Sequence, residues 1–342
     1  MTYKKIIIFY IFTISVFFSF FAIRFPYVFG IRADQGASLA DSSLDVSDGS
    51  SNANKSGNDS LSSYDGKPLT VLIAGDVMFD RYIRRSSEQR GGDYIFSCVN
   101  YLLTSSDIAL ANLEGPITSN DSLSRSTHEG DNHNTTFTFA TSTAQLLIEN
   151  NIKIVSIGNN HILNFGKDGL LETRNWLNGA GVRFFGDPYD DNYKEFQMMT
   201  KKIFLTFINY NEFGGDKKER VLERIKEASK LGGIVIVYTH WGDEYLPVPP
   251  RVKDLARQFV DAGADIVVGS HPHIVQENET YKGKKIYYSL GNFIFDQYFD
   301  DNVMEGLTLR LTINQDRSID VQEIPVQLEK DGRTCIKGLH TW

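Results

Sequence analysis

The chain has 342 residues, of which 41% are hydrophobic and 23% are charged, as is typical of a folded soluble domain with additional segments. Its formal net charge is -8, and lysine and arginine are scattered along the sequence rather than clustered. This distribution argues against a protein whose main task is to bind the phosphates of nucleic acids, so we expect no nucleic-acid partner.

The first hydrophobic segment predicts a membrane anchor. Lys4 and Lys5 precede an apolar run from Ile6 to Ile23 that is long enough to cross a bilayer as a helix. The residues from Arg24 onward do not resemble the small-residue cleavage site of a signal peptide, which favours an uncleaved signal anchor. The positive-inside rule then places everything after Gly30 outside the cytoplasm. We therefore expect a single-pass protein of the cell membrane whose main domain is extracytoplasmic.

Composition divides the chain into four parts. Residues 1–30 contain the cytoplasmic stub and the transmembrane signal anchor. Residues 31–67 are rich in serine, aspartate and asparagine and cannot cover a core, so we predict a disordered linker. Residues 68–330 are predicted to form the folded domain, and residues 331–342 a C-terminal tail.

After Pro68, short apolar runs alternate with amphipathic stretches, which is the pattern of strands alternating with helices. We predict strands at residues 69–74, 107–111, 152–157, 182–185, 203–208, 234–238, 265–268 and 285–289. Helices are predicted at residues 170–177, 217–230 and 252–262, where apolar residues recur at helical spacing. Residues 306–329 alternate with period two and predict a closing antiparallel hairpin. The expected fold class is α/β.

Polar residues follow six of these strands directly. Because the carboxyl ends of parallel strands meet at one edge of a sheet, the six loops should converge on one crevice. The loops contain Gly75-Asp76, Asn112-Leu113-Glu114, Asn159-Asn160-His161, His240-Trp241-Gly242-Asp243-Glu244, His271-Pro272-His273 and Gly291-Asn292-Phe293.

Together these loops supply carboxylates, amides and imidazoles without thiolates, a ligand set that suits Mn, Fe, Zn or Mg. The set is large enough for two divalent metal ions, which can clamp both the attacking and the leaving oxygen of a phosphoester. His271-Pro272-His273 is the strongest single signal, because alternate residues at a strand end project the same way. Taken alone, Asp76 could be a cap, Glu114 a solvated residue and His240 a core histidine; the combination favours a metal site.

The two cysteines, Cys98 and Cys335, are too few for a disulfide framework and have no metal-like spacing. Two unrelated thiols are the favoured interpretation. A single bridge is the alternative if the domain is exported.

The order of these motifs resembles the CapA family of capsule (poly-gamma-glutamate) synthesis proteins, a branch of the calcineurin-like metallophosphoesterase superfamily. His-Pro-His followed by Tyr-Ser-Leu-Gly-Asn-Phe is the most specific part, and the resemblance covers residues 69–296. It implies a four-layer αββα sandwich of the metallo-dependent phosphatase type, preceded here by one transmembrane helix, with metals at the carboxyl ends of the strands.

The resemblance also implies roles for individual residues. Its metal ligands would be Asp76, Asn112, Glu114, Asn160, His240, His271 and His273. His161 would act on the substrate by protonating a leaving oxygen or stabilising developing charge. Glu244 would orient a ligand or accept a proton. Arg81 and Asn292 are candidate substrate contacts, with ordinary solvation of Arg81 and turn-capping by Asn292 as the alternatives.

Three positions depart from the pattern of relatives. The superfamily pattern begins Asp-x-His, whereas Asp76 is followed by Val77 and Met78. Asn164 stands where CapA relatives usually carry an aspartate, and Ser270 precedes His-Pro-His where many relatives have a histidine. The last two changes leave the predicted ligands intact.

Two functions from different classes follow. The first is an envelope hydrolase that cleaves a phosphoester or a link in an anionic polymer, either polyglutamate or a glycopolymer. The second is a non-catalytic, metal-dependent subunit that binds the polymer in a capsule synthase or export complex. Expected partners are the membrane, the polymer and capsule synthase subunits. A cell-surface adhesion module would explain the anchor and the linker, but not the converging histidines.

Overall fold

The computed structural model describes residues 66–128, 130–215 and 217–338. The predicted anchor and all but the last two residues of the predicted linker lie outside the described residues. Within the described part of the chain, no helix combines the length and the hydropathy that a membrane span requires.

The first sheet has eight strands in the order β14-β13-β12-β1-β2-β3-β4, with β11 also paired to β1. The strands β1, β2, β3 and β4 are parallel to one another, and β11 is parallel to β1. The closing strands β12, β13 and β14 pair in antiparallel fashion. Their bounds are β1 Leu69–Val77, β2 Ile108–Leu113, β3 Ile152–Ser156, β4 Arg183–Phe185, β11 Asn292–Ile294, β12 Glu305–Ile313, β13 Ile319–Leu328 and β14 Thr334–Ile336.

The second sheet has six strands in the order β5-β6-β7-β8-β10-β9. Its central strands β6, β7, β8 and β10 are parallel, and β5 and β9 are antiparallel edges. Their bounds are β5 Glu195–Thr200, β6 Ile203–Asn211, β7 Ile234–His240, β8 Ile266–Ser270, β9 Asn278–Tyr281 and β10 Lys284–Tyr287.

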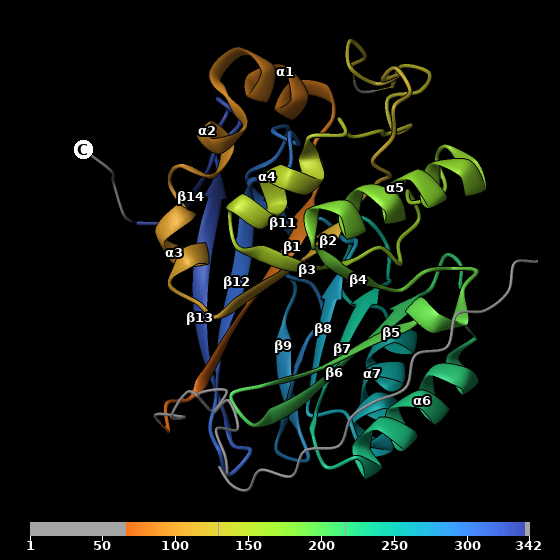
Figure 1. Ribbon diagram of the computed structural model, residues 1–342, viewed down its shortest axis with the longest axis vertical. Coiled ribbons are helices and arrows are strands. Elements are labelled where there is room, and N and C mark those ends of the chain that lie inside the picture. The colour runs from red at the N-terminus through yellow and green to blue at the C-terminus, as the bar shows by residue number, and fades with distance from the viewer. Residues whose placement is uncertain (1–65, 129, 216, 339–342) are drawn as a thin grey trace, which may run out of the picture. The chain divides into compact units, whose positions relative to one another are not determined.

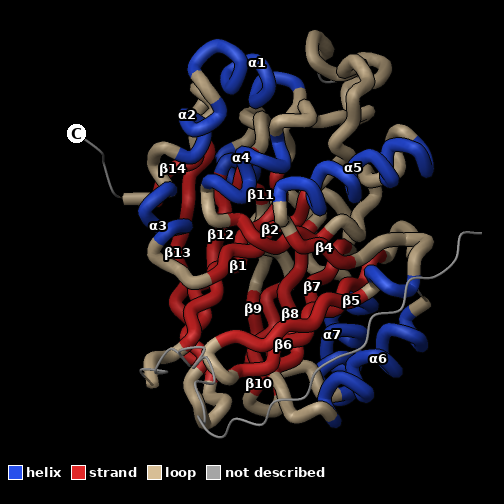
Figure 2. Tube along the Cα trace, in the orientation of Figure 1, coloured by secondary structure: helices blue, strands red, loops and turns tan. Residues whose placement is uncertain are grey.

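The two sheets face each other, as Figures 1 and 2 show, and buried apolar side chains from both sheets form a core between them. Leu110 of β2 and Phe207 of β6 belong to this core and are fully buried. Helices α1 to α5 pack on the outer face of the first sheet, and α6 and α7 pack on the outer face of the second. Helices, sheet, sheet and helices therefore follow one another. This arrangement agrees with the α/β class that the strand pattern predicted and with the four layers that the family resemblance implied.

The helices are mostly short. They are α1 Arg81–Arg90, α2 Gly92–Phe96, α3 Asn100–Thr104, α4 Thr143–Glu149, α5 Gly166–Ala180, α6 Lys218–Lys230, α7 Pro250–Ala262 and α8 Asp301–Met304, with a 3₁₀ turn at Asp191–Tyr193. The predicted helices at 170–177, 217–230 and 252–262 are confirmed as parts of α5, α6 and α7. The predicted strands and the closing hairpin are confirmed as well, with ends shifted by a few residues.

The first sheet continues beyond residue 330, where we expected the folded domain to end. Strand β14 pairs with β13, and its Cys335 forms a disulfide with Cys98, which lies between α2 and α3. The Cα atoms of the two cysteines are 4.7 Å apart. The favoured interpretation of two unrelated thiols is therefore wrong, because residues 237 positions apart in sequence meet where the sheet closes.

Candidate metal centre

The register of the parallel strands brings the predicted site residues together. In the first sheet, Asp76 of β1 lies beside Asn112 of β2 on one side and Asn292 of β11 on the other. In the second sheet, His240 of β7 lies beside Ser270 of β8. The carboxyl ends of both sets of strands meet, because the backbone N–H of His271 donates to Asp76 at 3.2 Å.

Two buried carboxylates form the floor of the site. Asp76 and Glu114 are fully buried, and the amide nitrogen of Asn112 donates to Asp76 at 2.8 Å and to Glu114 at 3.4 Å. Burial raises the pKa of Asp76 to about 6. Burial, followed by the charge of Asp76, raises the pKa of Glu114 well above its usual range. Among the described residues, Glu114 Oε1 has no hydrogen-bond partner, so the pocket contains an acceptor that calls for a cation or a proton.

Three side chains converge beside this floor. The Nε2 atom of His240 lies 2.9 Å from Asn160 Oδ1 and 3.2 Å from His271 Nδ1. The other ring nitrogen of His240, Nδ1, lies 3.0 Å from Ser270 Oγ, and this hydroxyl in turn donates to the Thr239 carbonyl. Ser270 can therefore accept the Nδ1–H of His240, which leaves Nε2 free as a ligand atom.

His273 joins the carboxylates to the imidazoles. Its Nε2 lies 3.5 Å from Glu114 Oε1, and its Nδ1 lies 2.9 Å from Asn292 Oδ1 and 3.5 Å from Asp76 Oδ2. Ligand atoms of Asp76, Glu114 and His273 lie within 4.8 Å of one another, as do those of Glu244, His271 and His273. Both groups satisfy the geometric requirement for holding a metal ion.

The imidazoles are held neutral. Burial lowers the pKa of His271 to about 4 and that of His273 to about 3, and burial lowers the pKa of His240 well below its usual range. Neutral imidazoles beside carboxylates and amide oxygens are metal ligands, because each offers a lone pair without adding positive charge. The donor set, together with the orphaned oxygen of Glu114, therefore fits one or two divalent ions.

The two histidines of the His-Pro-His motif meet for a different reason from the one we expected. Strand β8 ends at Ser270, so neither residue lies in a strand. Both adopt positive φ, 96° at His271 and 57° at His273, and their ring centroids are 5.9 Å apart. Non-glycine residues in this region are strained, and such strain concentrates at functional sites.

The remaining predicted residues occupy distinct places. His161 Nε2 lies 3.9 Å from Glu114 Oε1, and its ring contacts that of Phe137 at a centroid distance of 4.6 Å. Burial lowers the pKa of His161 to about 4. Glu244 is exposed at the rim. Asn112 presents its nitrogen to the carboxylates and its oxygen to Asn159, so it positions Asp76 rather than offering an oxygen to a cation.

The two candidate substrate contacts are buried rather than solvated. The Arg81 guanidinium pairs with Asp296 and lies 5.1 Å from the centroid of Phe137. Ordinary solvation of Arg81 is therefore excluded. Asn292 is fully buried; its oxygen faces His273 and its nitrogen donates to Gln297 at 3.0 Å and to the Val303 carbonyl at 3.0 Å. In this structure Asn292 orients His273.

Sequence reasoning missed two residues next to the site, Asp296 and Gln297. Gln297 links Asn292 to Tyr245, because its Nε2 donates to the Tyr245 hydroxyl at 2.8 Å. A signal was present: both residues follow the buried strand β11 closely, and this was the pattern that identified the other loops.

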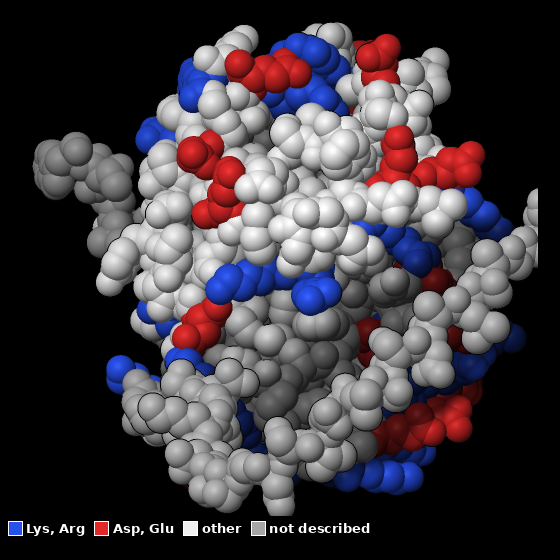
Figure 3. Space-filling model, viewed as in Figure 1, with Lys and Arg blue, Asp and Glu red and all other residues white. Residues whose placement is uncertain are grey.

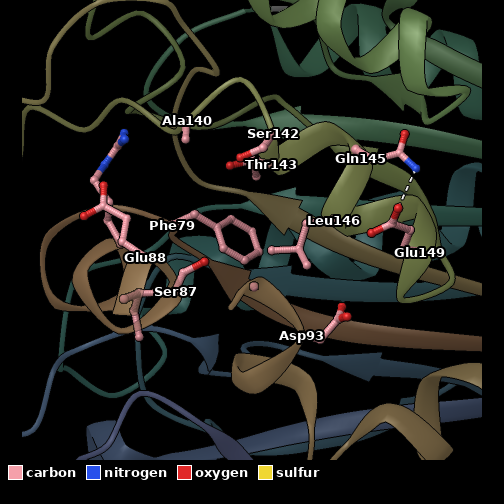
Figure 4. A pocket seen from close by; sticks show the side chains of 13 residues that line it. Phe79, Ser87, Glu88, Asp93, Ala140, Ser142, Thr143, Gln145, Leu146 and Glu149 are labelled. Atoms are coloured by element: carbon pink, nitrogen blue, oxygen red, sulfur yellow. Dashed lines mark hydrogen bonds between the residues drawn. The ribbon is translucent and has the colours of Figure 1, made fainter. Parts of the chain in front are cut away.

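A separate pocket of about 360 Å³ lies between α1 and α4 (Figure 4). Phe79 and Leu146 form its apolar floor, and Glu88, Asp93 and Glu149 lie around its rim. Its lining includes none of the predicted site residues, so it is distinct from the metal centre.

Fold and site together define a two-sheet α/β protein with a buried carboxylate–imidazole cluster whose geometry fits a metal ion. The family model "Bacterial capsule synthesis protein PGA_cap" matches residues 70–297. The chain belongs to this family.

Several curated proteins are similar to the chain. It is 31% identical over 263 residues to the PGA biosynthesis protein CapA of Bacillus subtilis, which covers 72% of this chain and 68% of that protein. It is 30% identical over 256 residues to the capsule biosynthesis protein CapA of Bacillus anthracis, covering 68% and 61%. A probable polyglutamine synthesis accessory protein of Mycobacterium tuberculosis is 27% identical over 172 residues, covering 42% and 45%.

Proposed function

We propose that this chain is a membrane-anchored, extracytoplasmic protein of capsule (poly-gamma-glutamate) biosynthesis whose metal centre hydrolyses a phosphoester or a link in an anionic envelope polymer. The single observation that carries the hydrolase proposal is the convergence of Asp76, Glu114 and His273 with the group formed by Asn160, His240 and His271. The order of layers and the place of this cluster at the strand ends agree with a metallo-dependent phosphatase type of sandwich.

The proposed location rests on two features. The apolar run from Ile6 to Ile23 precedes the folded domain, and the folded domain contains the Cys98–Cys335 disulfide. Structural disulfides form and persist in oxidising compartments and are rare in the cytosol. Both features support export of the domain.

The residues divide the chemical work as follows. Divalent ions held by the cluster would supply Lewis acidity and lower the pKa of water. Asp76 and Glu114 balance the positive charge, while Ser270 and Asn292 orient the ligating histidines. Because the pKa of His161 is lowered to about 4, its imidazole is neutral at pH 7. It can therefore stabilise developing negative charge as an Nε2–H donor, which favours this role over proton donation from an imidazolium.

The metal centre is tested on the full chain in detergent. Metal analysis of the wild type should give about two equivalents of Mn, and the His271→Ala/His273→Ala variant should lose them. Turnover of a phosphodiester or a glutamate polymer should depend on the metal. Absence of bound metal from the wild type would refute the proposal.

One observation favours the non-catalytic alternative, a polymer-binding subunit. Val77 and Met78, which follow Asp76, are fully buried in the apolar core beneath the helices. The imidazole that the wider superfamily pattern would supply there is therefore replaced by core packing. A variant of His161 distinguishes the two functions. His161→Ala should abolish turnover but still bind metal and polymer. The control is His133→Ala, at an exposed position, which should leave turnover, metal binding and polymer binding unchanged. Normal capsule production by His161→Ala cells would refute the catalytic role and leave the binding role.

A further inference from the structure

Next to the metal centre lies a second cavity, of about 600 Å³, that none of the predicted motifs explains. Its walls come from five separate parts of the chain. They are the start of α1, a loop that contributes residues 127, 128, 130, 131, 134 and 135, the single residues Tyr245 and Lys330, and residues 296–299 after β11. Aromatic residues line it together with hydroxyl and amide groups, among them Tyr245, Phe299, Thr127 and Asn134. We refer to it as the α1 groove.

The α1 groove reaches the metal centre at three points. Tyr245 lines the groove, and its ring lies 6.0 Å from that of His273. Thr135 also lines the groove, and its carbonyl accepts a hydrogen bond from Asn164, whose side chain lies 3.3 Å from His161. The groove therefore has an inner end at the site of the proposed reaction.

Arg81 forms the third point of contact. It lines the groove, and its charge opposes the rise in the pKa of Glu114. Its φ of 48° is strained for a non-glycine residue, and the ion pair with Asp296 holds the side chain in place. Among the described residues, its buried Nε has no hydrogen-bond acceptor. The inner end thus contains an unsatisfied cationic donor.

Two further cationic side chains, Arg85 and Lys330, line the outer part of the α1 groove. Arg85 lies over the ring of Tyr82 and donates to the Arg125 carbonyl, and Lys330 is exposed. Neither forms an ion pair within the part of the chain that the structure describes. Of the two carboxylates in the lining, Asp296 is already paired with Arg81, and Asp131 accepts from the His128 backbone. The lining thus holds three cationic side chains against two carboxylates, an excess of positive charge in a chain whose net charge is -8 and whose charges of both signs are interspersed over the face in Figure 3.

We infer that the α1 groove binds a flexible polyamide chain that carries repeated carboxylates and delivers it, with Arg85 and Lys330 as docking cations, to the metal centre. Guanidinium and ammonium groups bind carboxylates, the hydroxyl and amide groups can hydrogen-bond to amides, and the aromatic faces can cover aliphatic spacers. A phosphodiester polymer would also accept hydrogen bonds from these donors, so competition between the two kinds of chain decides which one the groove selects. The inference rests on the proposed function and adds the place at which the substrate binds.

The test measures binding of a fluorescein-labelled decamer of γ-linked glutamate to the full chain in detergent with Mn present, by fluorescence anisotropy. Arg85→Gln/Lys330→Gln should weaken binding at least tenfold and leave metal content unchanged. The matched control is Lys226→Gln/Lys230→Gln, which removes the same charge from exposed positions on α6 and should change the Kd less than twofold. A γ-linked glutamine decamer should bind at least tenfold more weakly than the glutamate decamer.

Other outcomes would overturn the inference. Equal weakening in both double variants would mean that only net charge matters. Equal competition by a glycerol-phosphate oligomer would exclude selectivity for a carboxylate chain, and absence of binding by the wild type would remove the groove as a site. The metal proposal fails separately: wild-type protein that binds the decamer but holds no metal would refute the hydrolase and retain the groove.

Discussion

At the scale of single residues, the candidate metal centre includes buried groups that we do not propose as ligands. Ser270 is fully buried and lies between the Thr239 carbonyl and Nδ1 of His240. Its hydroxyl fixes which nitrogen of the ring carries the proton. Asn292 has the same relation to His273. In metalloproteins, such partners orient the ligating rings, and their loss weakens metal binding.

Ser270→Ala should therefore lower the affinity for Mn by about 10- to 100-fold, because His240 loses the acceptor for its Nδ1–H. Isothermal titration with Mn measures the effect. Ser86→Ala is the matched control, since Ser86 is also buried and donates to a carbonyl, that of Asp331, outside the metal centre. Equal affinities for wild type and Ser270→Ala would show that Ser270 does not orient His240.

The sequence indicated the ligands but not these supporting roles. Asp76, Glu114 and His240 could be identified because polar residues follow apolar strands directly. Ser270 and Asn292 also lie in or beside these motifs, but their roles depend on strand pairing. The register between β7 and β8 brings Ser270 beside His240, and the pairing of β11 with β1 brings Asn292 beside Asp76. The positive φ at His271 and His273 was equally unreadable, because only the packed loop imposes it.

At the scale of elements, the two sheets are joined by a polar clamp at the end opposite the metal centre. Asp107, before β2, accepts from the backbone and the hydroxyl of Thr70 in β1, both at 2.8 Å, and pairs with Lys201 between β5 and β6 at 2.8 Å. Burial alone would raise the pKa of Asp107, but the hydrogen bonds from Lys201 and Thr70 outweigh it and lower the pKa below its usual range.

Asp107→Asn should destabilise the domain by about 1–2 kcal/mol at pH 7, as expected for hydrogen bonds to a charged group. A depressed pKa in the folded state contributes stability that is present above the unfolded pKa and lost as pH falls through the folded pKa. The difference in the free energy of unfolding between wild type and Asp107→Asn should therefore shrink below about pH 4. Urea unfolding at several pH values measures this difference.

The control for this clamp is Asp261→Asn, which removes an exposed ion pair with Lys282 and should cost less than about 0.5 kcal/mol. If the free energies of unfolding of wild type and Asp107→Asn differed by the same amount from pH 7 to pH 3, the charge of Asp107 would not be what stabilises the polar clamp.

Long, periodic elements could be predicted, whereas short ones could not. Helices α5, α6 and α7 show apolar residues at helical spacing. Helices α2 and α3 have five residues each, too few for a period to appear, and β14 has three. These short elements are stabilised by packing against the sheet and the core, so their own sequence does little to predict them.

At the scale of the whole molecule, the disulfide and the proposed anchor make a joint prediction. In protein from the cell envelope, Cys98 and Cys335 should resist a maleimide-linked polymer until the protein is denatured and reduced. A chain without residues 1–30, kept in the cytoplasm, should react at both cysteines after denaturation alone. The gel shift measures the number of free thiols. Two free thiols in the envelope form would contradict export into an oxidising compartment.

The Cys98–Cys335 bond also closes most of the described chain into a ring. The largely exposed residues 119–123 lie inside this ring, between the two cysteines in sequence. A protease that cuts there would produce two pieces that migrate together on a non-reducing gel and separate only after reduction. A domain nicked in this way can therefore remain in one piece, because β1 and β2 of the first fragment stay in the same sheet as β3 and β12 of the second.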